Sequence, residues 1–458
     1  MKLSVIGGGL SGCEAAWQAA KRGIDVELYE MRPEKTTGAH QTANLAELVC
    51  SNSLGSNLLN RASGLLKAEL RRLGSLLIEC ADASSLPAGN ALAVDRNVFS
   101  ACVEKKLVDH PQITIIRQEH HAIPNSPAVL ATGPLTSQAM LNSIKLFTGN
   151  DHLFFYDAIA PIVNYDSIDM EIAFRSDRYA FDSPNEGDYI NCPLDKEAYH
   201  SFWSALKTAQ RITIRDFEKE MDLGVDAGEG DYFQGCQPVE VIAQRGERAL
   251  AFGPMRPVGL VDPKTGRRPF AVVQLRQDNL VGDLYNLVGF QTNLTFSEQE
   301  RVFRLIPGLE NATFERFGQM HRNSFIAAPK LLDETLAFHS QPGLFVAGQL
   351  AGFEGYAGNI ASGLIAGINA AHFIKGFPPM VLPASTMTGA LIHYITHADL
   401  KDFQPMKAIF GLLPKPSDDK RRKKQERFDY YADRAMKDLE HFLQQQFGDL
   451  YKLNSDDE

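Results

Sequence analysis

Short apolar segments and helical segments alternate at the start of the chain. Lys2–Ile6 is an apolar run that predicts a buried parallel strand, and Gly7–Gly12 follows it with glycines at its first, third and sixth positions. Residues 13–20 predict a helix, and Ile24–Tyr29 predicts a second strand that ends at Glu30. This order of strand, glycine turn, helix and strand predicts a Rossmann-like βαβ unit.

The glycine turn and the acid after the second strand predict a dinucleotide site. Gly7 allows a tight turn, Gly9 lets the backbone approach a pyrophosphate, and Gly12 lets the helix pack closely on the strand. Glu30 stands eighteen residues after Gly12, where a carboxylate can accept hydrogen bonds from ribose hydroxyls. The cofactor-binding residues expected in this unit are Gly7, Gly8, Gly9, Leu10, Ser11, Gly12 and Glu30.

Later segments continue the same pattern. Gly64–Ile78 carries leucines on one stripe and predicts a helix, and Ile113–Ile116 predicts a strand. Pro127–Pro134 predicts a buried strand that stops at a tight turn, which brings Gly133 close to the nucleotide. Leu344–Gln349 predicts another strand and glycine turn, so Gly348 and Gln349 are also expected beside the cofactor.

Between about residues 150 and 330 the alternation gives way to mixed segments rich in aromatic residues, prolines and charges. We therefore expect an α/β fold with a Rossmann-like FAD-binding domain split by a mixed α+β insertion domain, and a helical C-terminal region. The expected boundaries are 1–150 and 331–380 for the two parts of the FAD-binding domain, 151–330 for the insertion or substrate domain, and 381–458 for the C-terminal region. Because large FAD proteins have such a split, FAD is favoured over NAD as the resident cofactor.

The composition, with 44% hydrophobic and 22% charged residues among 458, is ordinary for a globular protein of two or three domains. No apolar run approaches the roughly 20 residues that span a bilayer, and the short apolar N-terminus is no signal peptide. The six cysteines show no CxxC or paired spacing, which argues against a disulfide scaffold, a zinc site and a redox-active dithiol. We expect a cytoplasmic protein with no metal and no membrane contact, and the sequence implies no obligatory protein partner.

A series of motifs follows in order over nearly the whole chain. They are Gly7–Ala16, Tyr29–Pro33, Glu47–Leu54, Gly235–Glu240, Phe252–Leu260, Gln274–Asn279, Val288–Thr292, Met320–Asn323, Ala347–Gln349, His393–His397 and Phe410–Pro414. In these motifs the chain resembles the folate- and FAD-dependent tRNA (uracil-5-)-methyltransferases, the TrmFO family, which is related to the GidA and MnmG flavoproteins.

The resemblance implies a reaction and its cofactors. A uridine in tRNA receives a one-carbon unit from methylenetetrahydrofolate, reduced FAD supplies the electrons, and NADH or NADPH re-reduces the flavin. Carbon 5 of uracil is a poor nucleophile, so a thiolate must first add to carbon 6 and convert the ring to an enolate. A base then removes the proton from carbon 5, and donors stabilise the developing enolate oxygen.

Two cysteines carry over from the family motifs. Cys236 is the expected nucleophile, in a loop between Gly235 and Pro238, because proline cannot continue an interior helix. Cys50 is the second thiol that the resemblance implicates, as a nucleophile, a general acid/base or a guard of the resting site. The remaining cysteines are expected to be packing residues: Cys13, Cys80, Cys102 and Cys192.

Tyr356 and a histidine pair leave alternatives open. Tyr356 could stack on a pterin or flavin ring, or be a core tyrosine with a hydrogen-bonded hydroxyl. After Tyr356 the family pattern continues with a Val-Glu-Ser-Ala-like segment, whereas this chain has residues 357–360 as Ala-Gly-Asn-Ile, so a role for an acid there does not carry over. His393 and His397 can share a helix face, and without a Glu between them a structural pair or an RNA contact is favoured over a metal site.

Two basic regions are candidates for contact with tRNA, although the formal net charge of −10 argues against extensive coating by nucleic acid. The first spans Arg245–Arg276, with seven Lys or Arg and two acids between Val241 and Gln277. The second is the run Lys420–Lys424. A target base must leave its stack to reach a flavin, so an extruded nucleotide in a folded loop is expected.

Other functions compete with tRNA methylation. Ribosomal RNA uridine methylation would use the same chemistry, and a wobble-uridine-modifying flavoprotein shares the opening motif but is expected to be longer. A non-catalytic FAD-containing RNA-binding protein is disfavoured because Cys50 and Cys236 are both present. A generic disulfide reductase is disfavoured because no dithiol motif follows the first nucleotide motif.

Overall fold

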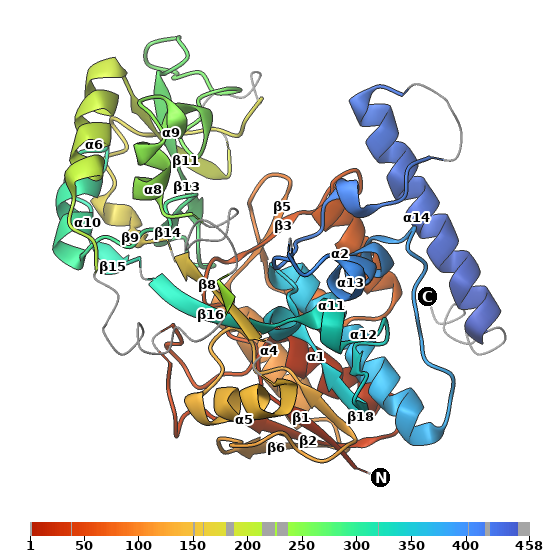
Figure 1. Ribbon diagram of the computed structural model, residues 1–458. Helices are drawn as coiled ribbons and strands as arrows, with labels where there is room; N and C mark the ends of the chain where they lie inside the picture. Colours follow the sequence, from red (N-terminus) through yellow and green to blue (C-terminus); the bar gives the residue numbers. More distant parts are fainter. Residues whose placement is uncertain are drawn as a thin grey trace.

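The computed structural model describes most of the chain. The described residues are 2–37, 39–149, 152–158, 160–179, 187–212, 225–226, 237–318, 320–401, 403–416 and 422–447, with the backbone alone for 152–158, 225–226 and 320–323. Two separate hydrophobic cores lie in this part of the chain, one under the first sheet and the C-terminal helices and one under the second sheet. Figure 1 shows these two bodies, with the second at the upper left.

The first sheet has six strands and contains the N-terminal βαβ unit. Its strands, in spatial order, are β17 (Ala337–Phe338), β18 (Gln341–Val346), β7 (Ala128–Leu130), β1 (Lys2–Ile6), β2 (Asp25–Glu30) and β6 (Ile113–Arg117). All neighbours pair in parallel except β17 and β18. In the sequence, the strands of the second sheet lie between β7 and β18, yet β18 pairs with β7 in the first sheet. The prediction of a split Rossmann-like fold is therefore confirmed.

The helices α1 (Leu10–Lys21) and α12 (Tyr356–Lys375) pack against each other at unusually close range. A Cβ added at Gly363 would lie 2.2 Å from the Ser11 carbonyl oxygen, and one at Gly367 would lie 2.4 Å from the Ala15 carbonyl oxygen. Glycine is therefore required at both positions for this contact. The small residues of the returning helix serve this packing against α1, which fixes the start of α1 relative to the returning segment.

The second body is built on a six-stranded antiparallel sheet, and a three-stranded sheet lies between the two bodies, where Phe325 and Ile326 of its last strand pack in the first core. The larger sheet has the order β10 (Phe174–Arg175), β11 (Tyr189–Leu194), β13 (Ala271–Gln277), β14 (Leu284–Leu287), β9 (Ile162–Asn164) and β15 (Phe314–Arg316). The smaller sheet has the order β12 (Val225–Asp226), β8 (His152–Ala158) and β16 (Met320–Ile326). In Figure 1, β8 and β16 run between the two bodies. A further small sheet consists of β3 (Ser53–Ser56), β5 (Ala91–Val94) and β4 (Ser85–Leu86).

The leucine-rich segment 64–78 forms parts of two helices and not the single helix that its periodicity predicts. The helix α2 (Ala62–Arg72) ends before Gly74, whose φ of +72° is left-handed, and α3 (Leu76–Ala83) starts after Ser75. The Ser75 side chain accepts a hydrogen bond from the Ile78 N–H and caps α3. A left-handed glycine followed by an N-cap serine therefore interrupts a continuous stripe of leucines.

The remaining helices cover the sheets and form the C-terminal region. They are α4 (Arg96–Val108), α5 (Gln138–Thr148), α6 (Lys196–Thr208), α8 (Val239–Gln244), α9 (Ala249–Phe252), α10 (Phe296–Phe303), α11 (Ala328–Leu331), α13 (Met387–His397) and α14 (Lys424–Phe447). The last helix begins at Lys424, so among the described residues of the basic run only Lys424 lies in it, and Arg422 and Lys423 precede it. Among the described residues, no helix combines the length and hydropathy needed to cross a bilayer.

Candidate active site

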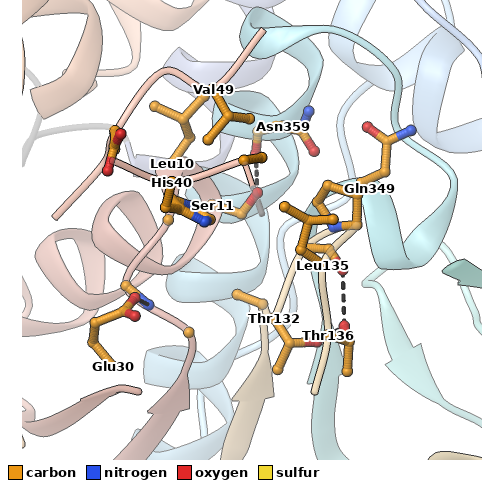
Figure 2. Close-up of a pocket in the computed structure, with 18 of the residues that line it drawn as sticks. Leu10, Ser11, Glu30, His40, Val49, Thr132, Leu135, Thr136, Gln349 and Asn359 are labelled. Carbon is orange, nitrogen blue, oxygen red and sulfur yellow. Dashed lines mark hydrogen bonds between the residues drawn. The ribbon is translucent and has the colours of Figure 1, made fainter. Parts of the chain in front are cut away.

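A cavity of about 370 Å³ lies at the carboxyl ends of β1, β2 and β7. Ligands of open α/β sheets bind at this edge. The wall combines the glycine turn, the end of β2, the segment around Cys50, the turn after β7 and the returning segment before α12 (Figure 2). The sequence-predicted residues that line it are Gly7, Gly8, Gly9, Leu10, Ser11, Glu30, Cys50, Gly133, Gln349 and Tyr356.

The three fingerprint glycines meet different surroundings. Gly7 has a left-handed φ of +109°, and a Cβ there would lie 2.4 Å from the Ala131 carbonyl oxygen. A Cβ at Gly12 would lie 1.8 Å from the Gly7 carbonyl oxygen, so this residue lies behind the cavity wall and permits the close packing. A Cβ at Gly9 would meet no atom within 4 Å. The space beside Gly9 is therefore open and can be occupied by a ligand.

The N-terminus of α1 faces this open space. Gly9 is its N-cap residue, and no side chain caps the first turn. The first N–H groups of a helix have no acceptor within the helix, and they carry the positive end of its dipole. The Ser11 hydroxyl donates to the Asn359 carbonyl at 2.9 Å (Figure 2), and Gly348, with φ +79°, packs against the Ser11 side chain. This cradle fits the pyrophosphate of a dinucleotide such as FAD.

Glu30 is held by a buried arginine as well as by the glycine turn. Its carboxylate accepts from the Gly8 N–H at 3.0 Å and from the Arg32 N–H and Nε at 2.9 Å each. Burial raises the pKa of Glu30, but the hydrogen bonds and charge of Arg32 outweigh it, so the net pKa is below the usual value. The carboxylate is therefore ionised and fixed in place at the cavity wall, where ribose hydroxyls can donate to it.

The Cys50 segment is attached to the returning segment through Tyr356. The Tyr356 hydroxyl accepts from the backbone N–H of Cys50 at 2.8 Å and from that of Ser51 at 2.9 Å. The same ring lines the cavity, and burial raises the pKa of its hydroxyl. The hydrogen-bonded hydroxyl agrees with the second interpretation of Tyr356, and stacking on a pterin or flavin ring stays a prediction.

Two arginines that sequence patterns did not indicate surround the Cys50 segment. Arg96 donates to the Leu48 carbonyl at 2.7 Å, and Arg316 donates to the Val49 carbonyl at 3.0 Å. Burial acts to lower the pKa of both guanidinium groups. The pKa of Arg96 is nevertheless raised, mainly by the charge of Asp278, whereas that of Arg316 is lowered, and a negative charge on Cys50 would act to raise both. A thiolate at Cys50 would therefore interact favourably with two positive charges contributed by α4 and β15.

Glu354 lines the cavity, and sequence patterns did not indicate it. It lies two residues before Tyr356, and its carboxylate accepts from the Gln349 amide at 2.6 Å. Burial raises the pKa of Glu354, although the Gln349 hydrogen bond acts to lower it. The chain therefore has a buried acid just before Tyr356, while the position just after it, where the family pattern has one, bears none.

Cys236, the expected nucleophile, lies outside the described residues. The residues that follow it are described: the Val239 N–H donates to the Gln291 carbonyl at 2.7 Å, and Gln291 lines the cavity.

The other cysteines are buried or partly buried, as expected. Cys13 and Cys192 are fully buried, and burial raises the pKa of both thiols. Cys80 and Cys102 come from adjacent helices, and their sulfur atoms lie 2.7 Å apart. This close thiol pair was not visible in the sequence, because twenty-two residues separate the two cysteines.

The first basic region is only partly available to a partner. Six of its seven Lys and Arg are exposed: Arg245, Arg248, Arg256, Lys264, Arg267 and Arg268. Arg276 is an exception that corrects the prediction, because it is 7% exposed on β13 and its Nε donates to the Asn52 side chain at 3.0 Å. In the second region Lys423 and Lys424 are exposed, and Lys420 and Arg421 lie outside the described residues.

Comparisons with known proteins agree with this architecture. The family model described as glucose inhibited division protein A matches residues 2–378. Two solved structures of GidA from Aquifex aeolicus superpose with TM-scores of 0.67 and 0.68 at 16% and 17% identity, covering 99% of this chain and 75% and 78% of theirs. At this identity the likeness shows the fold alone. The fold and cavity thus define a dinucleotide-binding protein of the GidA type.

Relatives at higher identity define the family more narrowly. A protein of Heliobacterium modesticaldum named methylenetetrahydrofolate--tRNA-(uracil-5-)-methyltransferase TrmFO is 52% identical over 97% of this chain and 98% of its own length. The protein of the same name from Pelotomaculum thermopropionicum is 54% identical over 96% of this chain and 98% of its own. The chain belongs to this methyltransferase family.

Proposed function

We propose that the protein methylates carbon 5 of a uridine in tRNA, with methylenetetrahydrofolate as one-carbon donor, FAD as resident cofactor and NADH or NADPH as reductant. The observation that carries the proposal is the position of the Cys50 segment in the wall of the cavity that the phosphate turn opens into. A thiol and a bound dinucleotide can thereby act on the same substrate in one cavity. Family membership supports the substrate and the folate donor.

The resident FAD is proposed to lie with its pyrophosphate at Gly9 and the α1 N-terminus, and with its ribose hydroxyls at Glu30. Gly133 and Gln349, both in the cavity wall, are expected to contact it from the two neighbouring turns. When bound and reduced, FAD supplies the hydride that completes the methyl group. The residues of the chain bind the uridine, hold the thiols and move the proton.

Cys236 is proposed to add to carbon 6 of the uracil ring. The resemblance of the Gly235–Glu240 motif to the family supports this role. Val239, in the described end of that motif, donates its N–H to the carbonyl of the cavity residue Gln291. Cys50 is proposed as the second thiol of the reaction, in a segment whose carbonyl groups accept hydrogen bonds from Arg96 and Arg316. Addition of the thiolate to carbon 6 makes carbon 5 nucleophilic, and the same sulfur leaves when the proton on carbon 5 is removed.

Glu354 is proposed as the base that removes the proton from carbon 5. Its carboxyl lies in the cavity wall, and its raised pKa brings it nearer to neutral pH, where a general base is most effective. The Gln349 amide orients it. The tRNA backbone is proposed to contact the exposed members of the two basic regions.

The test incubates the purified FAD-containing protein with NADH or NADPH, methylenetetrahydrofolate and an unmodified tRNA transcript, and measures 5-methyluridine by mass spectrometry. Cys236→Ala should abolish the product, and Glu354→Gln should slow it by about 100-fold or more, both with FAD retained. Cys102→Ala and Glu119→Gln, a cavity carboxylate paired with Lys35, serve as matched controls.

A ribosomal RNA transcript in the same assay separates the two RNA substrates. Product on ribosomal RNA but not on tRNA would assign the other target, and binding of tRNA without any product would identify a non-catalytic scaffold. A near wild-type rate for Cys236→Ala would show that the nucleophile assignment is wrong.

A further inference from the structure

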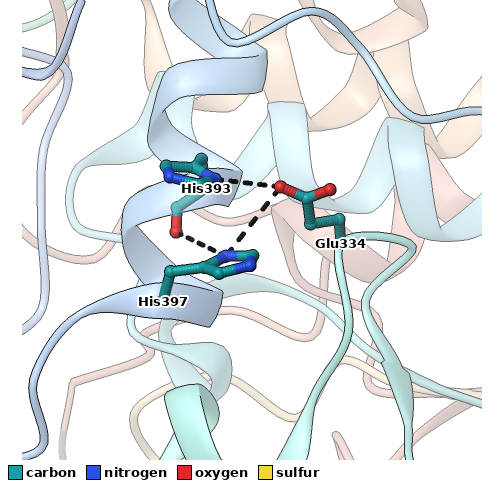
Figure 3. Close-up of side chains that lie close together, drawn as sticks. All are labelled: Glu334, His393 and His397. Carbon is teal, nitrogen blue, oxygen red and sulfur yellow. Dashed lines mark hydrogen bonds and ion pairs between the residues drawn. The ribbon is translucent and has the colours of Figure 1, made fainter.

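A cluster of two histidines and one glutamate lies on the C-terminal region. His393 and His397 are four residues apart on α13, and Glu334 lies in the segment between α11 and β17 (Figure 3). The His393 Nδ1 is 2.9 Å from a Glu334 carboxylate oxygen, and the His397 Nδ1 is 3.8 Å from the same oxygen. The three side chains are about half exposed, with values of 52%, 52% and 39%.

Both elements that carry the cluster are fixed by hydrogen bonds. The buried carboxylate of Glu69 accepts from the backbone N–H groups of Met387 and Thr388 and thereby caps the start of α13. The Asp333 carboxylate accepts from the Thr335 N–H at 2.8 Å and holds the turn that presents Glu334. The cluster is therefore presented by two anchored backbones and does not depend on a mobile loop end.

The spacing of the donor atoms fits a small transition-metal ion. Zinc binds imidazole nitrogen and carboxylate oxygen at about 2.0–2.2 Å, which places tetrahedral donors about 3.3 Å apart. The two measured separations, 2.9 and 3.8 Å, lie on either side of this value, and the donor atoms of all three residues lie within 4.8 Å of one another. The exposed side leaves a position for water.

The chemical nature of the donor atoms indicates which metal ions can bind. Two imidazoles with one carboxylate suit zinc and other late divalent transition metals, whereas magnesium and calcium prefer oxygen donors alone. The two rings are stacked with centroids 4.3 Å apart, and the His397 Nδ1 also lies 3.2 Å from the His393 carbonyl oxygen and 2.9 Å from the Thr396 hydroxyl, contacts that a bound ion would replace. The sequence interpretation of a structural pair did not include the third donor, because Glu334 is 59 residues before His393.

We propose that Glu334, His393 and His397 bind one divalent transition-metal ion of the zinc type, which joins α13 to the segment before β17. The ion binds each ring as neutral imidazole through the unprotonated Nδ1, and the ring proton is on Nε2, so neither an imidazolate nor an electron transfer is involved. The metal–ligand bonds connect α13 of the C-terminal region to the segment before β17, an edge strand of the first sheet. Because the ion binds the folded chain and not the unfolded one, it stabilises the fold by mass action.

The test uses the full-length FAD-containing protein after treatment with a chelator. Zinc binding is measured by competition with a chromophoric zinc indicator, and thermal unfolding is followed with and without zinc chloride. The wild-type protein should bind one zinc ion at this site and unfold at a higher temperature in its presence. His397→Ala should lose both effects, and Glu334→Gln should weaken binding by about 10-fold or more.

Two further variants make the result decisive. His441→Ala removes an exposed histidine on α14 that lies outside the cluster, and it should leave zinc binding unchanged. Cys102→Ala removes one member of the close thiol pair, which is the alternative zinc ligand in the described part of the chain. Zinc binding that persists in His397→Ala and disappears in Cys102→Ala would overturn the proposal, as would a wild-type protein that binds no zinc. Methylation by His397→Ala should persist, which separates this site from the proposed active site.

Discussion

A side chain at Gly9, in the glycine turn, would overlap with a bound ligand but would not clash with the protein. A Cβ there meets no atom within 4 Å, whereas a Cβ at Gly12 meets the Gly7 carbonyl oxygen at 1.8 Å. Gly9→Val should therefore fold and lose FAD, whereas Gly12→Ala should lower the stability of the fold itself. Flavin absorbance and the circular dichroism melting temperature of both variants separate the two effects. Stoichiometric FAD in Gly9→Val would show that the pyrophosphate lies elsewhere.

His40, in the cavity wall, links stability to pH. Burial and the positive charge of Arg32 lower its pKa to about 4, with Arg316 acting in the same direction and Glu47 and Glu30 opposing it. The unfolded chain, with a pKa near 6.5, binds a proton that the folded chain excludes between these two values. The stability that the neutral ring supports is therefore present above about pH 6.5 and is lost as the pH falls to 4.

The expected difference is measurable against a variant that cannot titrate. Between about pH 7 and pH 4 the wild-type protein should lose about 1–3 kcal/mol more unfolding free energy than His40→Gln. Urea unfolding of both proteins at each pH gives this difference. Parallel pH profiles would mean that His40 has the same pKa in the folded and unfolded chains, and would contradict this prediction.

At the residue scale, sequence and structure agree where chemistry is local. The roles of Gly7 and Gly12 could be predicted because strand, glycine turn and helix follow one another in a known motif, even though the Gly7 contact is with Ala131. Those of Arg96, Arg316 and Glu354 could not, because no motif joins these residues to their hydrogen-bond partners.

At the element scale, the Cys50 segment depends on a helix more than 300 residues later. The Tyr356 hydroxyl, at the first residue of α12, accepts from two successive backbone N–H groups of this segment. Tyr356→Phe leaves both N–H groups without this acceptor. An unpaired buried N–H that water cannot reach destabilises the structure by about 1–3 kcal/mol. We therefore expect a kcat for methylation lower by about 10- to 100-fold, with FAD retained.

The matched control for this change is Tyr29→Phe. Tyr29 also lines the cavity, but its hydroxyl makes one long contact of 3.4 Å with Glu27. Single-turnover methylation and FAD content of both variants should show a loss in Tyr356→Phe alone. Equal rates would mean that the Cys50 segment holds its position without this tyrosine.

Element boundaries were predicted well where periodicity stood alone and poorly where a cap interrupted it. The strand predicted at Ile113–Ile116 lies within β6, and the apolar start of the segment predicted at Leu344–Gln349 lies within β18, which begins three residues earlier. The stripe of leucines in 64–78 hid the break between α2 and α3, because a left-handed Gly74 and the Ser75 cap override periodicity at that point.

At the scale of the whole molecule, the two bodies are joined by polar contacts beside the cavity. Arg96 on α4 forms an ion pair with Asp278 at 3.1 Å, and the Asn52 amide donates to the Gln277 carbonyl at 2.8 Å. The sequence predicted a split fold from the return of the strand pattern. It could not predict this interface, which pairs residues separated by 182 and 225 positions.

The basic region Arg245–Arg276 yields a prediction that depends on this whole-molecule arrangement. Arg267 is exposed, whereas Arg276 is buried and donates to Asn52 at the junction of the two bodies. If phosphates contact the exposed members, Arg267→Gln should weaken tRNA binding and reduce the slope of log K against log salt by about 1. Arg276→Gln should leave that slope unchanged and instead lower the melting temperature, because it removes a buried hydrogen bond. Filter binding over a range of salt concentrations measures both slopes. Equal slopes for wild type and Arg267→Gln would place the RNA on another face, and a reduced slope in Arg276→Gln would mean that this arginine reaches phosphate despite its burial.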